Sequence, residues 1–196
     1  MPRLAPALAT GLLCLGLVGC ALAVNSRPPT TYDLVAPRSF AASKRPAPFQ
    51  LVVQEPTAVY ALESNRLMVR PQADQVSYYK GIAWSDRLPR LVQARIIETF
   101  QNSGAVKAVS ATTGQYALLT DLRAFQIDVT GGKAFAEIEI FAKLVNTASG
   151  KVVATKGFSA RVPATSDAPT DAIAALNQAF TEVLQDTTTW VASRKA

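Results

Sequence analysis

Hydrophobic and polar residues alternate most regularly between Ala134 and Leu144, where every second residue is alanine, isoleucine or leucine. A period of two indicates a β-strand with one buried face. Residues 116–129 and 151–162 flank this stretch, and two glycine-containing turns separate the three segments. The pattern therefore predicts an antiparallel meander of three long strands.

Shorter apolar runs that end at proline or glycine predict further strands. These runs are residues 49–54, 66–70, 76–80 and 106–109, and residues 57–62 are expected to make a helical turn. In the long strand at 116–129, one face is expected to carry Leu119, Phe125, Ile127 and Val129.

Two segments have the spacing of amphipathic helices. The first is expected to start at Ser85-Asp86, with Pro89 in its first turn, and to end at Gly104, which suits a left-handed helix cap. Its apolar face consists of Leu88, Leu91, Val92, Ile96 and Phe100. The second runs from about Pro169 to Ser193, and its face consists of Ile173, Leu176, Phe180, Val183, Leu184, Thr187 and Val191, with Trp190 beside it. The predicted fold class is α+β: a two-layer domain over residues 49–196, with a mainly antiparallel sheet and both helices on one face.

Residues 1–19 have the pattern of a secretory signal, because Arg3 precedes an apolar stretch. The sequence Leu17-Val18-Gly19-Cys20 resembles the lipobox of bacterial lipoproteins. That resemblance implies cleavage before Cys20, attachment of diacylglycerol to its thiol, and acylation of the new amine with a fatty acid such as palmitate. Two alternatives remain: ordinary signal-peptide cleavage after Ala23, and a cytoplasmic domain in which Cys20 is buried.

Residues 20–48 are expected to form the lipidated cysteine and a proline-rich tether. Prolines and small polar residues dominate this stretch, and such a composition predicts an extended chain that lets the domain stand off its membrane. The sequence Tyr32-Asp33-Leu34 is a small apolar island within it, with the character of a segment that docks on the domain.

The composition excludes several kinds of active site. The chain has no histidine, so a Ser-His-Asp triad, a Cys-His pair and a His-ligated metal cannot occur. Cys14 would leave with the signal and Cys20 would carry lipid, so no thiol would remain. The net charge of +6 is scattered along the chain, and an exported protein rarely meets nucleic acid. We therefore predict no cofactor, no metal and no nucleic-acid partner.

Glu137 and Glu139 form a pair of carboxylates on one side of a predicted strand, about 7 Å apart by strand rise. Paired carboxylates can perform acid–base chemistry. The regular alternation around them instead favours the solvated face of a sheet.

A cluster of aromatic and charged residues is the candidate partner-binding site. It consists of Tyr78, Tyr79, Trp84, Asp86 and Arg87. Aromatic side chains with arginine nearby often anchor interfaces. In the alternative interpretation, Trp84 and one tyrosine fill the junction between sheet and helix.

The segment from 66 to 104 also carries a more specific motif. It contains Arg66-x-Met68-Val69-Arg70, Tyr78-Tyr79-x-Gly81-x-x-Trp84-x-Asp86-x-Leu88-Pro89 and Asn102-Ser103-Gly104. With Tyr32-Asp33-Leu34, Trp190 and the lipobox, these residues resemble the auxiliary lipoproteins of ABC-type transport systems, the paraquat-inducible protein C-like family.

The resemblance implies a non-enzymatic accessory protein that acts with an ABC permease, its ATPase and an MCE-domain protein. Such a system moves phospholipid or other hydrophobic molecules across the periplasm. The lipoprotein would be lipid-anchored at the outer membrane, would face the periplasm and would dock the MCE assembly there. Ala21 rather than aspartate after Cys20 agrees with the outer membrane. Family members can self-assemble into rings, which implies a homo-oligomer.

Two other functions compete with this one. The first is a structural or assembly lipoprotein of the outer membrane without a transport role. The second is an exported hydrolase, which the missing histidine and thiol disfavour.

Overall fold

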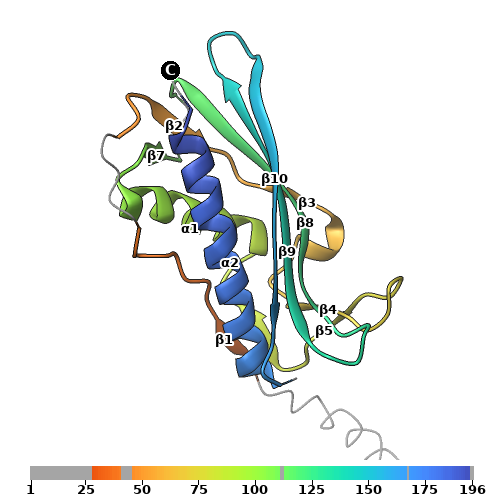
Figure 1. The fold of residues 1–196 in the computed structure, drawn as a ribbon. Helices are drawn as coiled ribbons and strands as arrows, with labels where there is room; N and C mark the ends of the chain where they lie inside the picture. Colours follow the sequence, from red (N-terminus) through yellow and green to blue (C-terminus); the bar gives the residue numbers. More distant parts are fainter. Residues whose placement is uncertain (1–27, 41–45, 111–112, 167, 195–196) are drawn as a thin grey trace, which may run out of the picture.

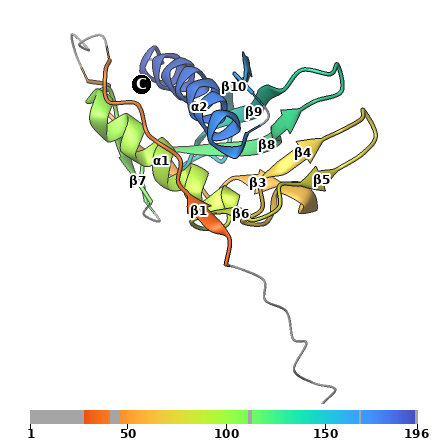
Figure 2. The same ribbon diagram turned by 90° about the horizontal axis from the view of Figure 1, so that it is seen from below.

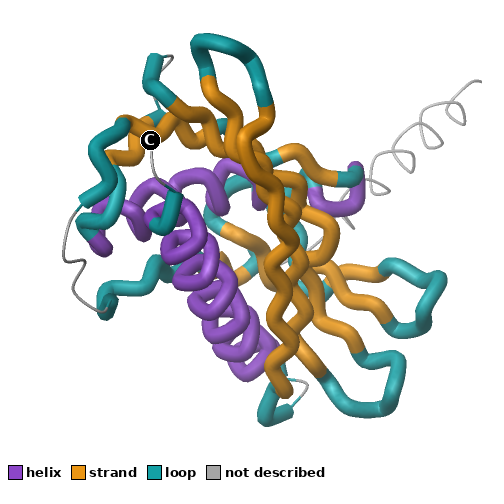
Figure 3. Tube along the Cα trace, turned by 45° about the horizontal axis from the view of Figure 1, so that its top comes forward, coloured by secondary structure: helices purple, strands orange, loops and turns teal. Residues whose placement is uncertain are grey.

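The computed structural model describes residues 28–40, 46–110, 113–166 and 168–194. Cys20 lies outside these residues. A twisted sheet forms one layer, and both long helices cover the same face of it (Figure 1 and Figure 3). The predicted α+β class and the placement of both helices on one face are confirmed.

Three long strands form the predicted antiparallel meander. They are β8 (Tyr116–Asp128), β9 (Phe135–Asn146) and β10 (Val152–Pro163). The first turn uses Gly132 with φ of 75° and the second uses Gly150 with φ of 68°, a left-handed conformation that glycine adopts without strain. The meander was readable from sequence because strand period and turn residues agree.

The other edge of β8 is paired by three short strands, one after another. They are β2 (Gln50–Val53), β3 (Thr57–Ala58) and β4 (Met68–Arg70), and all run parallel to β8. Beyond them lie β7 (Lys107–Val109), which is parallel to β2, and β5 (Ser77–Tyr78), which is antiparallel to β4. The sheet as a whole is therefore mixed. The antiparallel part is the meander, and the parallel part comes from long-range pairing.

A β-bulge in β8 changes which side chains face the helices. The register with β9 shifts between Leu122 and Ala124. One extra residue inverts the alternation beyond it. Phe125 and Ile127 point into the core, whereas Leu119 lies on the outer face and is 39% exposed. The expectation that Leu119 shares a face with Phe125 and Ile127 is therefore wrong.

The helices match their predicted positions closely. Helix α1 spans Leu88–Ser103, and Gly104 caps it in the left-handed conformation with φ of 60°. It begins two to three residues later than expected, and Asp86 accepts a hydrogen bond from the amide of Arg87 at 2.7 Å directly ahead of the first turn. Helix α2 spans Pro169–Ala192 and packs on β9 and β10.

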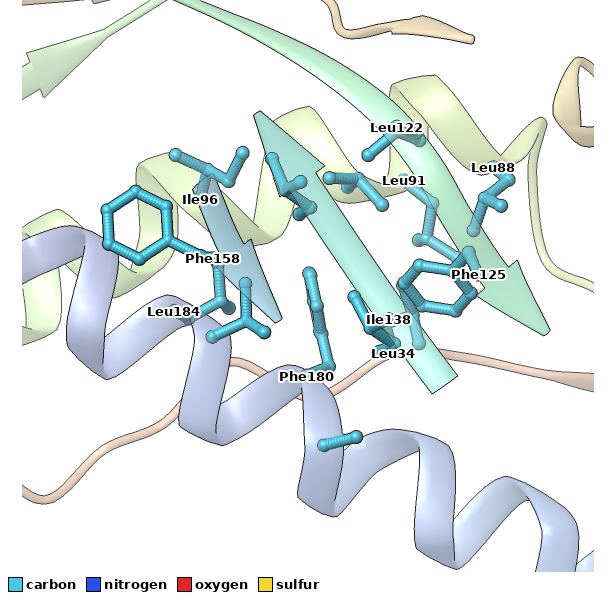
Figure 4. Packing of buried hydrophobic residues seen from close by; sticks show 14 of the residues in the cluster. Leu34, Leu88, Leu91, Ile96, Leu122, Phe125, Ile138, Phe158, Phe180 and Leu184 are labelled. Atoms are coloured by element: carbon cyan, nitrogen blue, oxygen red, sulfur yellow. The ribbon is translucent and has the colours of Figure 1, made fainter. Parts of the chain in front are cut away.

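Aromatic side chains link the two layers through the core. Trp84 on β6 (Ile82–Trp84) meets Phe125 edge to face at 5.9 Å between ring centroids, and Phe125 meets Phe180 of α2 at 5.6 Å. Near the end of α2, Trp190 packs on Phe158 of β10 at 5.6 Å. Figure 4 shows Phe125, Phe158 and Phe180 pointing into the space between sheet and helices. Such contacts add to the stability that burial supplies.

The N-terminal segment is docked on the domain. Strand β1 (Thr30–Tyr32) pairs in parallel with β6, and Leu34 and Ala36 are buried. The segment then passes across the helices (Figure 2), where the amide of Val35 donates to Asn177 of α2. The apolar island was expected to dock, but the packed stretch is longer than that island. The packed domain begins at about Thr30 rather than at Phe49.

Candidate partner-binding surface

Trp84 is part of the core. Its side chain is 2% exposed, and its backbone amide donates to the carbonyl of Asn65 at 2.7 Å. A side chain with so little accessible surface cannot contact a partner while the domain is folded. The packing interpretation therefore holds for Trp84, and Trp84 leaves the candidate contact patch.

Tyr78 and Tyr79 are half-buried at the margin of the same region. The Tyr78 hydroxyl donates to the carbonyl of Ala61 at 3.1 Å, and the guanidinium of Arg66 lies 3.6 Å above its ring. The amide of Tyr79 donates to Leu67 at 3.0 Å. Because both residues are only partly buried, they can border a contact surface without forming its centre.

Arg87 connects two carboxylates on neighbouring segments. Its guanidinium contacts Glu55 at 2.5 Å and Glu63 at 2.9 Å, which follow β2 and the 3-10 helix η1 (Tyr60–Leu62) respectively. Asp86, beside it, pairs with Arg90 at 3.4 Å. Each pair is partly exposed, so its contribution to stability is small. The network mainly fixes the position of η1 relative to the start of α1.

The most exposed large side chain near this network is Tyr60, at 93%. Val59 beside it is 59% exposed. We define the η1 surface as Glu55, Val59, Tyr60, Glu63 and Arg87. The exposure of Tyr60 could not be predicted from the sequence, because a short turn has no hydrophobic period. An apolar pair inside a predicted turn was the available signal.

The outer face of the sheet carries a hollow of about 450 Å³ next to the η1 surface. Its apolar floor includes Leu119 and Phe141, and Arg123 stacks 4.4 Å above the Phe141 ring. The hollow is lined by Gln54, Glu55, Thr57, Ala117, Leu119, Thr120, Asp121, Phe141 and Lys143. Glu55 belongs to both features, so they form one continuous surface.

The carboxylate pair on β9 is used structurally. Glu139 pairs with Arg123 at 3.2 Å, and Glu137 accepts a hydrogen bond from Gln126 at 2.8 Å. Among the described residues, no group of three acidic, cysteine or histidine side chains converges as a metal site would require. The solvated-face interpretation of Glu137 and Glu139 fits these contacts.

Asp128 has the best-defined electrostatic environment on this face. Its carboxylate accepts a hydrogen bond from the amide of Thr130 at 2.9 Å and pairs with Arg161 at 3.1 Å. The amide of Thr130, together with the charge of Arg161, lowers the pKa of Asp128 below its ordinary value. This arrangement holds the turn after β8 against β10.

The sequence pattern of one known family spans this whole arrangement. The family is described as the ABC-type transport auxiliary lipoprotein component, and it matches residues 32–187. The chain belongs to this family. The matched region starts inside β1 and ends in the last turns of α2, so it includes the docked N-terminal segment, the sheet and both helices. A lipoprotein family of this kind is membrane-anchored in the cell envelope.

Relatives of the family share sequence and fold. The chain is 34% identical over 164 residues to an uncharacterized protein of Bradyrhizobium diazoefficiens, covering 82% of this chain but 44% of that longer protein. A crystal structure of a Xanthomonas campestris protein of family DUF330 is 28% identical, with a TM-score of 0.75 over 83% of this chain and 95% of that one. An uncharacterized protein of known structure shares the fold at 13% identity, with a TM-score of 0.68 over 84% of this chain and 99% of that one.

In this auxiliary lipoprotein, no helix of the described segments is long and apolar enough to cross a membrane.

Proposed function

We propose that this auxiliary lipoprotein serves an MCE/ABC-type transport system that moves phospholipid or other hydrophobic molecules across the cell envelope. It acts as a non-enzymatic accessory subunit, anchored at the outer membrane and facing the periplasm, where it docks the MCE-domain protein. The family match across residues 32–187 carries the proposal.

The proposed anchor is lipid on Cys20, and the docked N-terminal segment limits its reach. Thr30, where β1 begins, is the tenth residue after Cys20. At a maximum of about 3.5 Å per residue, this connection spans no more than about 35 Å. The domain is thus held nearer to its membrane than a free tether of residues 20–48 would allow.

The proposed contact surface for the MCE-domain protein is the η1 surface together with the neighbouring hollow. Tyr60 supplies an exposed aromatic side chain, the residue type most often found at the centre of protein interfaces. The ion pairs of Arg87 hold this turn in place before binding. A preformed turn lowers the entropy cost of association.

Affinity purification tests the proposal directly. The tagged protein is crosslinked in cells, extracted in detergent, and its partners are identified by mass spectrometry. We expect an MCE-domain protein together with an ABC permease and ATPase. Recovery of outer-membrane assembly or cell-wall proteins in their place would favour a structural lipoprotein and reject the transport role.

A further inference from the structure

Strand β10 ends the sheet with an open edge. The strand order runs from β10 through β9 and β8 to β2 and β7, so β10 has a single neighbour in the described structure. It is 12 residues long, and the residues along its edge are mostly exposed. Long open edges are uncommon in native proteins, because their free backbone groups can pair with another chain.

The register shows which backbone groups are free. The amide of Ala164 donates to Ala134, next to the end of β9. Because backbone groups alternate along an antiparallel pair, those of Thr155, Gly157, Ser159 and Arg161 point away from β9. Pro163 also has its backbone directed away from β9. Proline has no N–H, and at this position no N–H is needed to pair with β9. These four residues, at every second position of β10, thus offer backbone N–H donors and carbonyl acceptors to an added strand.

The charge along this edge has one sign. Residues 151–163 include Lys151, Lys156 and Arg161 and no acidic residue. Arg161 pairs with Asp128, whereas Lys156 makes no ion pair within the described residues and lies 5.1 Å from the Phe158 ring. Two copies of β10 placed edge to edge would bring together two Lys156 side chains, neither of which has a carboxylate partner among the described residues. Like charges opposite one another destabilise a strand pair.

Gly157 leaves a gap in the outer face of the sheet. It pairs with Phe141, and a Cβ placed on Gly157 would meet only the Phe141 ring, at 3.9 Å. A glycine inside a strand often marks a place where another chain approaches closely. A large side chain on an added strand, opposite Gly157, can therefore reach the exposed flank of Phe141.

From these four observations we propose that the open edge of β10 binds an extended acidic segment of a partner protein as an added β-strand. One face of that segment carries carboxylates toward Lys156. The other face places an aromatic or large aliphatic residue opposite Gly157, against Phe141. The positive charge of this edge disfavours pairing with a second copy of β10 and favours a partner of opposite charge. The same feature therefore attracts the acidic segment and excludes a second copy. The proposal is independent of the transport role.

Amide hydrogen exchange on the full-length lipoprotein in detergent micelles tests the proposal. The probe is a short synthetic peptide that alternates glutamate with valine and carries one central phenylalanine. We expect the peptide to slow exchange at Thr155, Gly157, Ser159 and Arg161, because these amides gain hydrogen-bond partners. The matched peptide has lysine in place of glutamate and is expected to bind about fivefold more weakly or worse.

Three variants and one control separate the parts of the proposal. Lys156→Glu is expected to weaken the acidic peptide about fivefold and to improve binding of the lysine peptide. Gly157→Val adds a Cβ that would lie 3.9 Å from the Phe141 ring and two methyl groups that fill the gap, and is expected to abolish the preference for phenylalanine over alanine in the peptide. Ser159→Pro removes one outward amide and is expected to abolish binding, whereas Ser159→Ala retains it.

Three results would overturn the proposal. The first is no slowing of exchange by either peptide at millimolar concentration. The second is equal slowing by the acidic and basic peptides, which would show that charge does not select the partner. The third is protection of the same four amides without peptide that rises with protein concentration, which would assign the edge to a second copy of the chain.

Discussion

Asp33 accepts a hydrogen bond from the guanidinium of Arg95 at 2.8 Å, and this ion pair joins the N-terminal segment to α1. Burial opposes the charge on Arg95, but the hydrogen bond to Glu98 and the nearby Asp33 carboxylate outweigh it and raise the pKa of Arg95. The guanidinium is therefore charged at neutral pH. The segment that leads to the proposed lipid anchor is thus held by charge as well as by burial.

Two adjacent residues test how much this docking contributes to stability. Leu34 is 2% exposed and Val35 is 56% exposed. Leu34→Ala leaves a cavity and is expected to lower the free energy of unfolding by about 2–3 kcal/mol. Val35→Ala is expected to change it by less than about 0.5 kcal/mol. Urea titration of both variants measures the difference, and equal effects would show that the segment is not packed in solution.

Tyr60→Ala separates binding from folding. The side chain is 93% exposed, so its removal is expected to shift the free energy of unfolding by less than about 0.5 kcal/mol. Recovery of the MCE-domain protein in the crosslinking experiment is expected to fall several-fold. Val76→Ala, at an exposed apolar side chain that is not part of the η1 surface, is the matched control and should leave recovery unchanged. Undiminished recovery with Tyr60→Ala would place the contact elsewhere.

Trp84→Ala is expected to affect stability rather than binding, the opposite of Tyr60→Ala. It removes a buried indole that packs on Phe125, and is expected to lower the free energy of unfolding by about 3–5 kcal/mol. Any loss of partner recovery would then follow the loss of folded protein. Thermal unfolding measured beside recovery distinguishes the two causes. A stable variant that fails to bind would return Trp84 to the contact surface.

The carboxylate of Asp128 makes stability depend on pH. Because the folded state lowers the pKa of Asp128, its contribution is present above the unfolded value of about 3.9 and is lost as pH falls through the folded value. Asp128→Asn is expected to be less stable than wild type by about 1–2 kcal/mol at neutral pH. This difference in the free energy of unfolding between wild type and Asp128→Asn should narrow below about pH 4. Urea titrations at both pH values check this, with Asp74→Asn on an exposed turn as control; a gap that is independent of pH would contradict the assignment.

Cys20→Ala tests the anchor. The variant lacks the thiol that would carry diacylglycerol, and is expected to move from the membrane fraction to the soluble periplasmic fraction. Cys14→Ala is the matched control, because that residue would be removed with the signal. Cell fractionation and mass measurement of the mature N-terminus report the outcome. A Cys20→Ala protein that has lost its signal sequence but remains fully membrane-bound would rule out lipid on Cys20 as the anchor.

Some features of the candidate surface could be predicted from sequence and others could not. Tyr78, Tyr79, Asp86 and Arg87 do lie in one region, because a short motif keeps its residues close together. Trp84 points inward and Tyr60 outward, and no local pattern distinguishes these two aromatic residues. The burial of Trp84 depends on Phe125 of β8, which lies far along the chain from it.

The sequence by itself determined the two helices, the three strands of the meander and the absence of histidine chemistry, since each depends on local period or on composition. Only the tertiary structure decided the parallel pairing of β2, β3 and β4 along β8, the bulge that turns Leu119 outward, and the extension of the docked N-terminal segment beyond Tyr32-Asp33-Leu34. These features arise from contacts between distant segments. The period of a hydrophobic pattern indicates that one face of an element is buried. Which segment covers that face depends on which distant partner supplies the better packing and hydrogen bonds.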